Sequence, residues 1–165
     1  MLYYPTPLET WIYILYKRLG IYLPSEIDEQ VIAQKLGIYL YYKPIPSSSY
    51  ENGRFKSITI DSRKTKKEQR EDFFHELCHL LRHVGWQAGM MMPEAFRELQ
   101  EHDSINFTRY AAIPFHMLKL FDIHDEQVVF HISESCNVTT TLVTDRLERI
   151  KYSAVSRIIA KGGTI

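Results

Sequence analysis

The stretch His75-Glu76-Leu77-Cys78-His79 has the residue types and the spacing of a metal site. On an α-helix, side chains four residues apart share a face, so both imidazoles can reach one ion. Glu76 lies about 100° around the helix from His75, where it can take a proton from an attacking water. This pattern predicts zinc-dependent peptide hydrolysis. The alternative is two surface histidines beside a solvated glutamate, but chance predicts only about 0.02 such motifs in a chain of this composition.

A catalytic zinc normally takes a third protein ligand and leaves one position for water. A metzincin pattern is excluded, because Arg82 and Gly85 stand where that pattern needs Gly and His. His83 continues the histidine stripe, but it lies two turns, about 12 Å, from His75 along a straight helix. We therefore expect His83 beside the site and not on the ion.

The helix expected after Pro93 offers other donors, which are Glu94, Glu98, Glu101, His102 and Asp103. Small side chains, which let helices approach closely, fall on or near the face of Glu101: Ser104, Thr108, Ala111 and Ala112. His102 and Asp103 lie about 100° and about 160° from that face. Glu101 is therefore the predicted third ligand. Tyr110, His116 and Tyr152 are candidate oxyanion donors, and the sequence does not rank them.

Helical periodicity and turn residues predict the elements that must position these side chains. The N-terminal part should hold a helix over 7–18, a second helix that opens at Pro24 with Ser25 as its N-cap, a strand over 38–42, a loop over 44–52, and a strand over 57–61 that could align a substrate by edge pairing. The metal motif should lie on a helix from Thr65 to Gly85, followed by a connection at 90–92. Further helices are expected from Pro93 to Ile113 and over 115–120, 125–135 and 138–150, with frayed residues at 161–163. An α+β fold follows, with a small early sheet and a mostly helical remainder.

Composition narrows the class of protein. The chain has 165 residues with 20 basic and 20 acidic side chains, so it shows no excess of positive charge that would favour nucleic acid as the main partner. Cys78 and Cys136 are too few for a disulfide framework. The first residues lack the order of a secretion signal, and no apolar run approaches the roughly 20 residues of a membrane span. A cytoplasmic protein is expected.

Two segments carry a family resemblance. Residues 74–81 read Phe-His-Glu-Leu-Cys-His-Leu-Leu, and residues 101–114 read Glu-His-Asp-Ser-Ile-Asn-Phe-Thr-Arg-Tyr-Ala-Ala-Ile-Pro. Together they resemble the ImmA/IrrE metallopeptidases, which show His-Glu-Leu-Gly-His and then Glu-x-x-Ala-Asn-x-Phe-Ala. Cys78, Ser104 and Ile105 depart from that pattern. The resemblance places Glu101 on the family's third ligand and is strongest over residues 57–118.

The resemblance implies a single zincin-like domain over residues 1–165, with an N-terminal helix in 1–20 and a helical C-terminal extension from about 122 to 165. It also implies a substrate. ImmA-like proteins of phages and mobile elements act as anti-repressors that cleave a helix-turn-helix repressor, and IrrE-like members cleave a repressor of the DNA-damage response. This short chain looks more like the ImmA branch.

Two alternative functions follow from other features. Residues 132–150 have a helix-turn-helix pattern, with Asn137 at the turn, which would suit a DNA-binding regulator. Against DNA contact, Asp145 and Glu148 offset the charges of Arg146 and Arg149. The segment is better interpreted as a helical hairpin that packs on the catalytic part or docks the repressor. A non-enzymatic anti-repressor that acts by binding, with a structural metal, is the remaining alternative.

Overall fold

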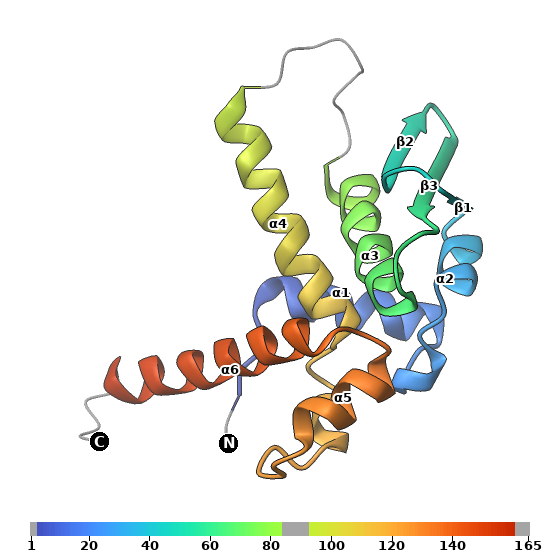
Figure 1. Ribbon diagram of the computed structural model, residues 1–165. Coiled ribbons are helices and arrows are strands. Elements are labelled where there is room, and N and C mark those ends of the chain that lie inside the picture. Colours follow the sequence, from blue (N-terminus) through green and yellow to red (C-terminus); the bar gives the residue numbers. More distant parts are fainter. Residues whose placement is uncertain (1–2, 84–92, 161–165) are drawn as a thin grey trace.

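The computed structural model describes residues 3–83 and 93–160, with side chains through residue 152. Helix α3 (Lys66–Arg82) lies between a small sheet and helix α4 (Glu94–Ala112), and α1 (Pro7–Leu19) packs against α4 (Figure 1). Helices α5 (Val128–Cys136) and α6 (Thr140–Ala160) lie below α3 and α4 in this view. The predicted α+β class, with a small early sheet and a mostly helical remainder, is confirmed.

The first two predicted helices are found, and the second begins later than expected. Helix α1 has a capping box, in which the Glu9 amide donates to Thr6 Oγ1 at 3.2 Å, and it ends at Gly20 with φ 73°. The prediction of Ser25 as the second N-cap is wrong. Pro24–Glu26 forms only a 3-10 turn, η1, and helix α2 (Glu29–Lys35) is capped by Asp28. The chain turns between them because Ile27 leaves helical geometry, and its side chain is buried in the core.

The sheet has three strands in the order β1-β3-β2, where β1 is Tyr39–Lys43, β2 is Ser48–Asn52 and β3 is Phe55–Asp61. Strand β3 is parallel to β1 and antiparallel to β2. The prediction of a loop over 44–52 is therefore wrong for its second half. Residues 57–61 form the central strand, so they have no free edge, and the free edges belong to β1 and β2.

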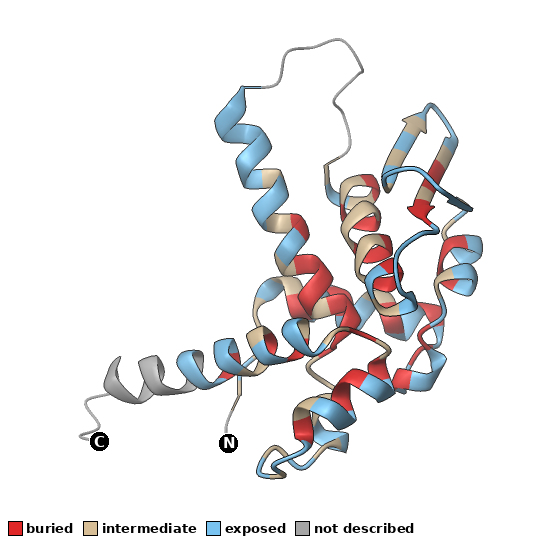
Figure 2. Cartoon of the chain, viewed as in Figure 1, coloured by how far each residue is buried: buried red, intermediate tan, exposed pale blue. Residues whose placement is uncertain are grey.

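Helix α3 begins after Thr65, which caps it, and buries Phe73, Phe74 and Leu77 completely. These side chains share one core with Ile58 and Ile60 of β3. Pro93 precedes α4, and the helix ends at Ala112, just before Pro114. Figure 2 shows that the N-terminal half of α4 is mostly exposed, whereas its second half is buried between neighbours. The predicted helix end at Gly85, the connection at 90–92 and the frayed residues 161–163 lie outside the described residues.

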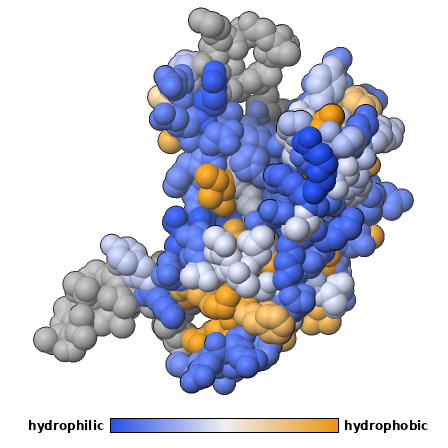
Figure 3. Space-filling model, viewed as in Figure 1, coloured by the Kyte–Doolittle hydropathy of each residue, from blue (hydrophilic) through white to orange (hydrophobic). Residues whose placement is uncertain are grey.

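The C-terminal segment contains a 3-10 turn η2 (Leu118–Leu120), α5 (Val128–Cys136) and α6 (Thr140–Ala160), so the last helix is longer than predicted. Asn137 joins α5 to α6 in the left-handed conformation, with φ 50°. A cavity of about 700 Å³ lies among these three elements, and apolar side chains gather at the lower end of the face in Figure 3. None of the described helices has the length and apolar character needed to cross a membrane.

Candidate metal centre

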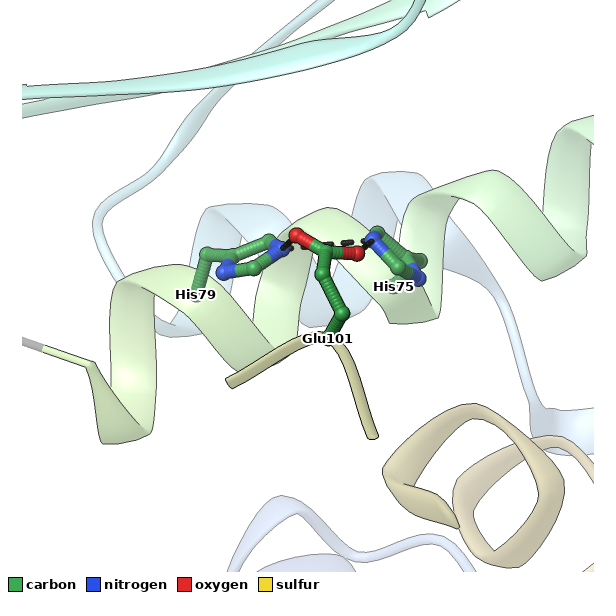
Figure 4. Close-up of side chains that lie close together, drawn as sticks. All are labelled: His75, His79 and Glu101. Carbon is green, nitrogen blue, oxygen red and sulfur yellow. Dashed lines mark hydrogen bonds and ion pairs between the residues drawn. The ribbon is translucent and has the colours of Figure 1, made fainter. Parts of the chain in front are cut away.

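Helices α3 and α4 bring three nitrogen- and oxygen-bearing side chains together. His75 and His79 lie one turn apart on α3, with their Nε2 atoms 3.2 Å apart. The Glu101 carboxylate of α4 lies across both rings, 3.3 Å from His75 Nε2 and 3.6 Å from His79 Nε2 (Figure 4). These are the three side chains that the sequence predicted as ligands.

The separations among these donor atoms fit a zinc ion. Ligand atoms about 2.0–2.1 Å from a tetrahedral zinc lie about 3.3–3.4 Å from one another. The measured values of 3.2, 3.3 and 3.6 Å are close to that geometry. Two imidazoles and one carboxylate are also a normal donor set for catalytic zinc. Within the described part of the chain, this group holds three side chains that could bind a metal, and it lacks a fourth.

Glu76 follows His75 on α3, on the side of the helix that faces strand β2. Burial raises the pKa of its carboxyl group, and a hydrogen bond from Ser49 of β2 partly opposes that rise. A carboxylate with a raised pKa is a better proton acceptor near neutral pH. The position and the protonation behaviour of Glu76 therefore suit a general base beside the three candidate ligands.

The close approach of α3 and α4 depends on small residues of α4. Ser104 is fully buried, and its Oγ lies 3.4 Å from His79 Nε2. Thr108, Ala111 and Ala112 continue this buried surface toward the end of the helix. A large side chain at Ser104 would occupy the space between the two helices and would move Glu101 away from the imidazoles.

Residues 33–148 match the IrrE N-terminal-like domain, peptidase family M78. This chain belongs to that family. It is 34% identical to the phage-like element PBSX protein XkdA of Bacillus subtilis over 147 aligned residues. This alignment covers 88% of this chain and 73% of the relative. The chain is 38% identical over 119 residues to the uncharacterized protein YqaB of the same organism, which covers 72% and 68%.

The IrrE N-terminal-like domain is a metallopeptidase domain with a zincin-like fold, and the family therefore implies a bound metal. The matched region runs from α2 into α6 and includes His75, Glu76, His79 and Glu101. The family match and the donor geometry thus concern the same residues of the chain.

Asp103 differs from its expected position in this IrrE-like domain. The helical wheel placed it away from α3, but its carboxylate accepts a hydrogen bond from Arg82 Nε at 2.8 Å and lies 3.2 Å from His83 Nε2. His83 in turn lies 3.0 Å from His79, Nδ1 to Nδ1. His83 therefore contacts a candidate ligand, as expected for a residue beside the ion. A helical wheel describes α4 alone and therefore could not predict this contact. Arg82 at the end of α3 and His83 just after it extend to the side of α4 that carries Asp103.

Cys78 is fully buried on α3, and its Sγ lies 3.7 Å from the Asp103 carboxylate. Burial raises the pKa of the thiol to about 12. A thiol with so high a pKa stays protonated at neutral pH. This environment agrees with the interpretation of Cys78 as a structural residue.

The three candidate oxyanion donors lie elsewhere in the fold. Tyr110 is nine residues from the third candidate ligand, about 13 Å along α4, and its ring lies under the Arg146 guanidinium at 4.7 Å. His116 packs edge-on against Tyr13 of α1, with ring centroids 4.9 Å apart. Tyr152 on α6 is 77% exposed. The structure does not bring these rings to the three candidate ligands, and the sequence carried no signal of the distances between elements.

Proposed function

We propose that this protein is a zinc-dependent endopeptidase. The observation that carries the proposal is the convergence of His75, His79 and Glu101, with Glu76 beside them on the same helix as the histidines. In this proposal His75, His79 and Glu101 hold the zinc. A structural zinc is usually closed by four protein ligands, so a group of three among the described residues favours a catalytic role.

Bound zinc would supply a Lewis acid that acidifies water and polarises a peptide carbonyl. Glu76 then takes the proton of the attacking water and passes it to the leaving amine. Ser49 keeps the Glu76 carboxylate oriented through its hydrogen bond. The oxyanion donor is unassigned in this proposal, because Tyr110, His116 and Tyr152 lie in other parts of the fold.

Strand β2 is the element best placed to align a substrate. It is an edge strand, it packs against α3, and it carries Ser49 beside Glu76. An extended peptide can add to such an edge through main-chain hydrogen bonds. This role replaces the one that the sequence suggested for residues 57–61.

The proposed substrate is a helix-turn-helix repressor of a phage or mobile element. The sequence resemblance to the ImmA branch supports this substrate, and so does the similarity to a protein of the phage-like element PBSX. Such a repressor acts on DNA inside the cell, so a cytoplasmic location belongs to the same proposal.

The test is incubation with the repressor encoded beside the gene of this protein, with and without a chelator. The wild-type protein should produce defined fragments that the chelator abolishes. Glu76→Gln should retain zinc and lose cleavage, whereas Glu98→Gln, on the exposed face of α4, should retain both. Normal cleavage by Glu76→Gln would contradict the role of Glu76 as the general base. An intact, stable complex with the repressor would instead support an anti-repressor that acts by binding.

A DNA-binding role receives less support. The two arginines of the predicted helix-turn-helix segment 132–150 that could face DNA, Arg146 and Arg149, are engaged within the protein. Arg146 is buried in an ion pair with Glu9, and Arg149 donates to Asp145 at 3.2 Å. A salt-dependent gel shift with operator DNA would nevertheless favour that role over proteolysis.

A further inference from the structure

The histidine stripe of α3 continues past the two proposed ligands into a hydrogen-bonded chain. His79 faces the proposed zinc position with Nε2, because that atom lies 3.2 Å from His75 Nε2 and 3.6 Å from the Glu101 carboxylate. Its other nitrogen, Nδ1, lies 3.0 Å from Nδ1 of His83. Nε2 of His83 then lies 3.2 Å from the Asp103 carboxylate.

The protonation of the ring nitrogens of His79 and His83 follows from the role of His79 Nε2 as a metal ligand. A neutral imidazole that offers the Nε2 lone pair to a metal must carry its proton on Nδ1. His79 Nδ1 therefore donates, and Nδ1 of His83 must accept. His83 consequently carries its own proton on Nε2, which points at an acceptor-only carboxylate. The three groups form one directed path of hydrogen bonds that ends at Asp103.

The end of this path is fixed by its surroundings. The Asp103 carboxylate accepts from Arg82 Nε at 2.8 Å and lies 3.7 Å from the buried Cys78 thiol. The His83 side chain is only 10% exposed, so water competes little for its ring nitrogens. Both ends of the path come from the two helices that supply the proposed ligands, α3 and α4.

We propose that His83 and Asp103 are positioning residues that fix the orientation and tautomer of His79, an inference that rests on the proposed zinc site. Ligating histidines commonly donate their second N–H to a carboxylate or a carbonyl, and such partners raise the basicity of the ligand. Here a second histidine lies between the ligand and the carboxylate. Helix α4 therefore contacts the proposed site through two side chains: Glu101 as a ligand, and Asp103 through His83.

A second metal bound by Cys78, His83 and Asp103 is the competing interpretation, because their donor atoms lie within 4.8 Å of one another. The Arg82 guanidinium on Asp103 opposes it, since a cation already occupies that carboxylate. The zinc content of the protein decides between the two: one zinc per chain supports the positioning role, and two overturn it.

The decisive experiment measures zinc affinity by competition with a chromophoric chelator. His83→Phe removes the acceptor for His79 and should weaken zinc binding by about 10- to 100-fold. His83→Asn keeps an acceptor near the position of Nδ1 and should recover part of that loss. Asp103→Asn keeps the shape and removes the charge, so a smaller loss is expected. The matched control is His102→Phe. His102 is exposed and precedes Asp103 in the sequence, so this variant should bind zinc like the wild type.

Two further readouts separate positioning from a merely structural role. The cobalt-substituted protein should show a shifted visible spectrum in His83→Phe, because the field of the His79 ligand changes. The melting temperature of the metal-free variant should change little. Zinc binding by His83→Phe within twofold of the wild type would overturn this inference while the proposed function stands. Failure of the wild-type protein to bind zinc would overturn both.

Discussion

At the scale of single residues, the position of Glu101 needs a reason. Its side chain is 50% exposed, yet the carboxylate lies across two imidazole edges and not out in water. Ion pairs of exposed side chains contribute little to stability, so folding alone gives little reason for this arrangement. A metal ion bound by His75, His79 and Glu101 would be a strong reason for it.

Replacing Glu101 by Gln should therefore weaken zinc binding by at least about tenfold, because a neutral amide is a poor zinc ligand compared with a carboxylate. Peptide cleavage should fall with zinc occupancy. Chelator competition measures the affinity, and Glu98→Gln on the same helix serves as the control. Unchanged affinity in Glu101→Gln would remove it from the ligand set.

The sequence predicted the three candidate ligands and the general base, because spacing on one helix and a face of small residues on the next are local properties. It did not predict the contact between His83 and Asp103. That contact depends on where the last turn of α3 lies relative to α4, and the wheel of a single helix does not contain this information. For the same reason the sequence did not report where Tyr110, His116 and Tyr152 lie relative to the candidate ligands.

At the scale of elements, the packing of α3 on α4 sets the ligand geometry. Ser104 has no exposed surface and lies against His79. Ser104→Leu should destabilise the fold by about 1–3 kcal/mol through overpacking and should also lower zinc affinity, because the helices must separate. Ser104→Ala should bind zinc normally.

Urea unfolding of the metal-free protein and chelator competition on the folded protein measure these two effects separately. Ala95→Leu adds a leucine to a small residue at an exposed position of α4 and controls for the added volume. If Ser104→Leu bound zinc with wild-type affinity, the small-residue surface would not be what brings Glu101 to the histidines.

Among the elements, β2 was missed although its turn was visible in the sequence. Gly53 and Arg54 form the two-residue turn to β3, and a glycine at the first turn position, here with φ 58°, is a hairpin signal. The strand itself is polar, with Ser48 and Ser49 where apolar residues would mark a strand, because its outer edge is free. Its pairing to β3 is a local hairpin contact, which hydrophobic periodicity does not report because β2 carries few apolar residues. The prediction of one domain with a C-terminal extension stays a prediction.

At the scale of the whole molecule, ion pairs join the C-terminal helix α6 to α4 and α1. Asp145 of α6 pairs with Arg109 of α4 and with Arg149. Burial tends to raise the pKa of the Asp145 carboxyl group, but hydrogen bonds and charge from the two arginines outweigh it, and the pKa lies below its usual value.

This shift predicts how the stability conferred by Asp145 depends on pH. A carboxyl group with a lowered pKa in the folded state stabilises the fold above its unfolded pKa, about 3.9, and loses that effect as the pH falls through the folded value. Asp145→Asn should therefore melt below the wild type at pH 7, and the gap should narrow below about pH 4. Calorimetry at several pH values measures it, and a gap that widens in acid would contradict the assignment.

The deepest link between the two ends of the chain is the ion pair of Arg146 and Glu9, whose side chains are each 1% exposed. Arg146→Met should lower the free energy of unfolding by about 3–5 kcal/mol, because Glu9 is left charged and buried without its partner. Zinc affinity of the folded protein should be unchanged, since Arg146 contacts the far end of α4, at Ile113. Urea unfolding and chelator competition measure the two quantities.

The second substitution Glu9→Gln tells charge from packing in that loss. A glutamine at position 9 keeps an acceptor for the Thr6 amide, which Glu9 now binds at 2.7 Å, and removes the unpaired charge. If the buried charge dominates, Glu9→Gln in the Arg146→Met background should recover most of the lost stability, although Glu9→Gln alone destabilises the wild type. If the double variant is as unstable as the sum of the two single ones, Arg146 acts through its packing on Tyr110 and Tyr3, and the ion pair contributes little.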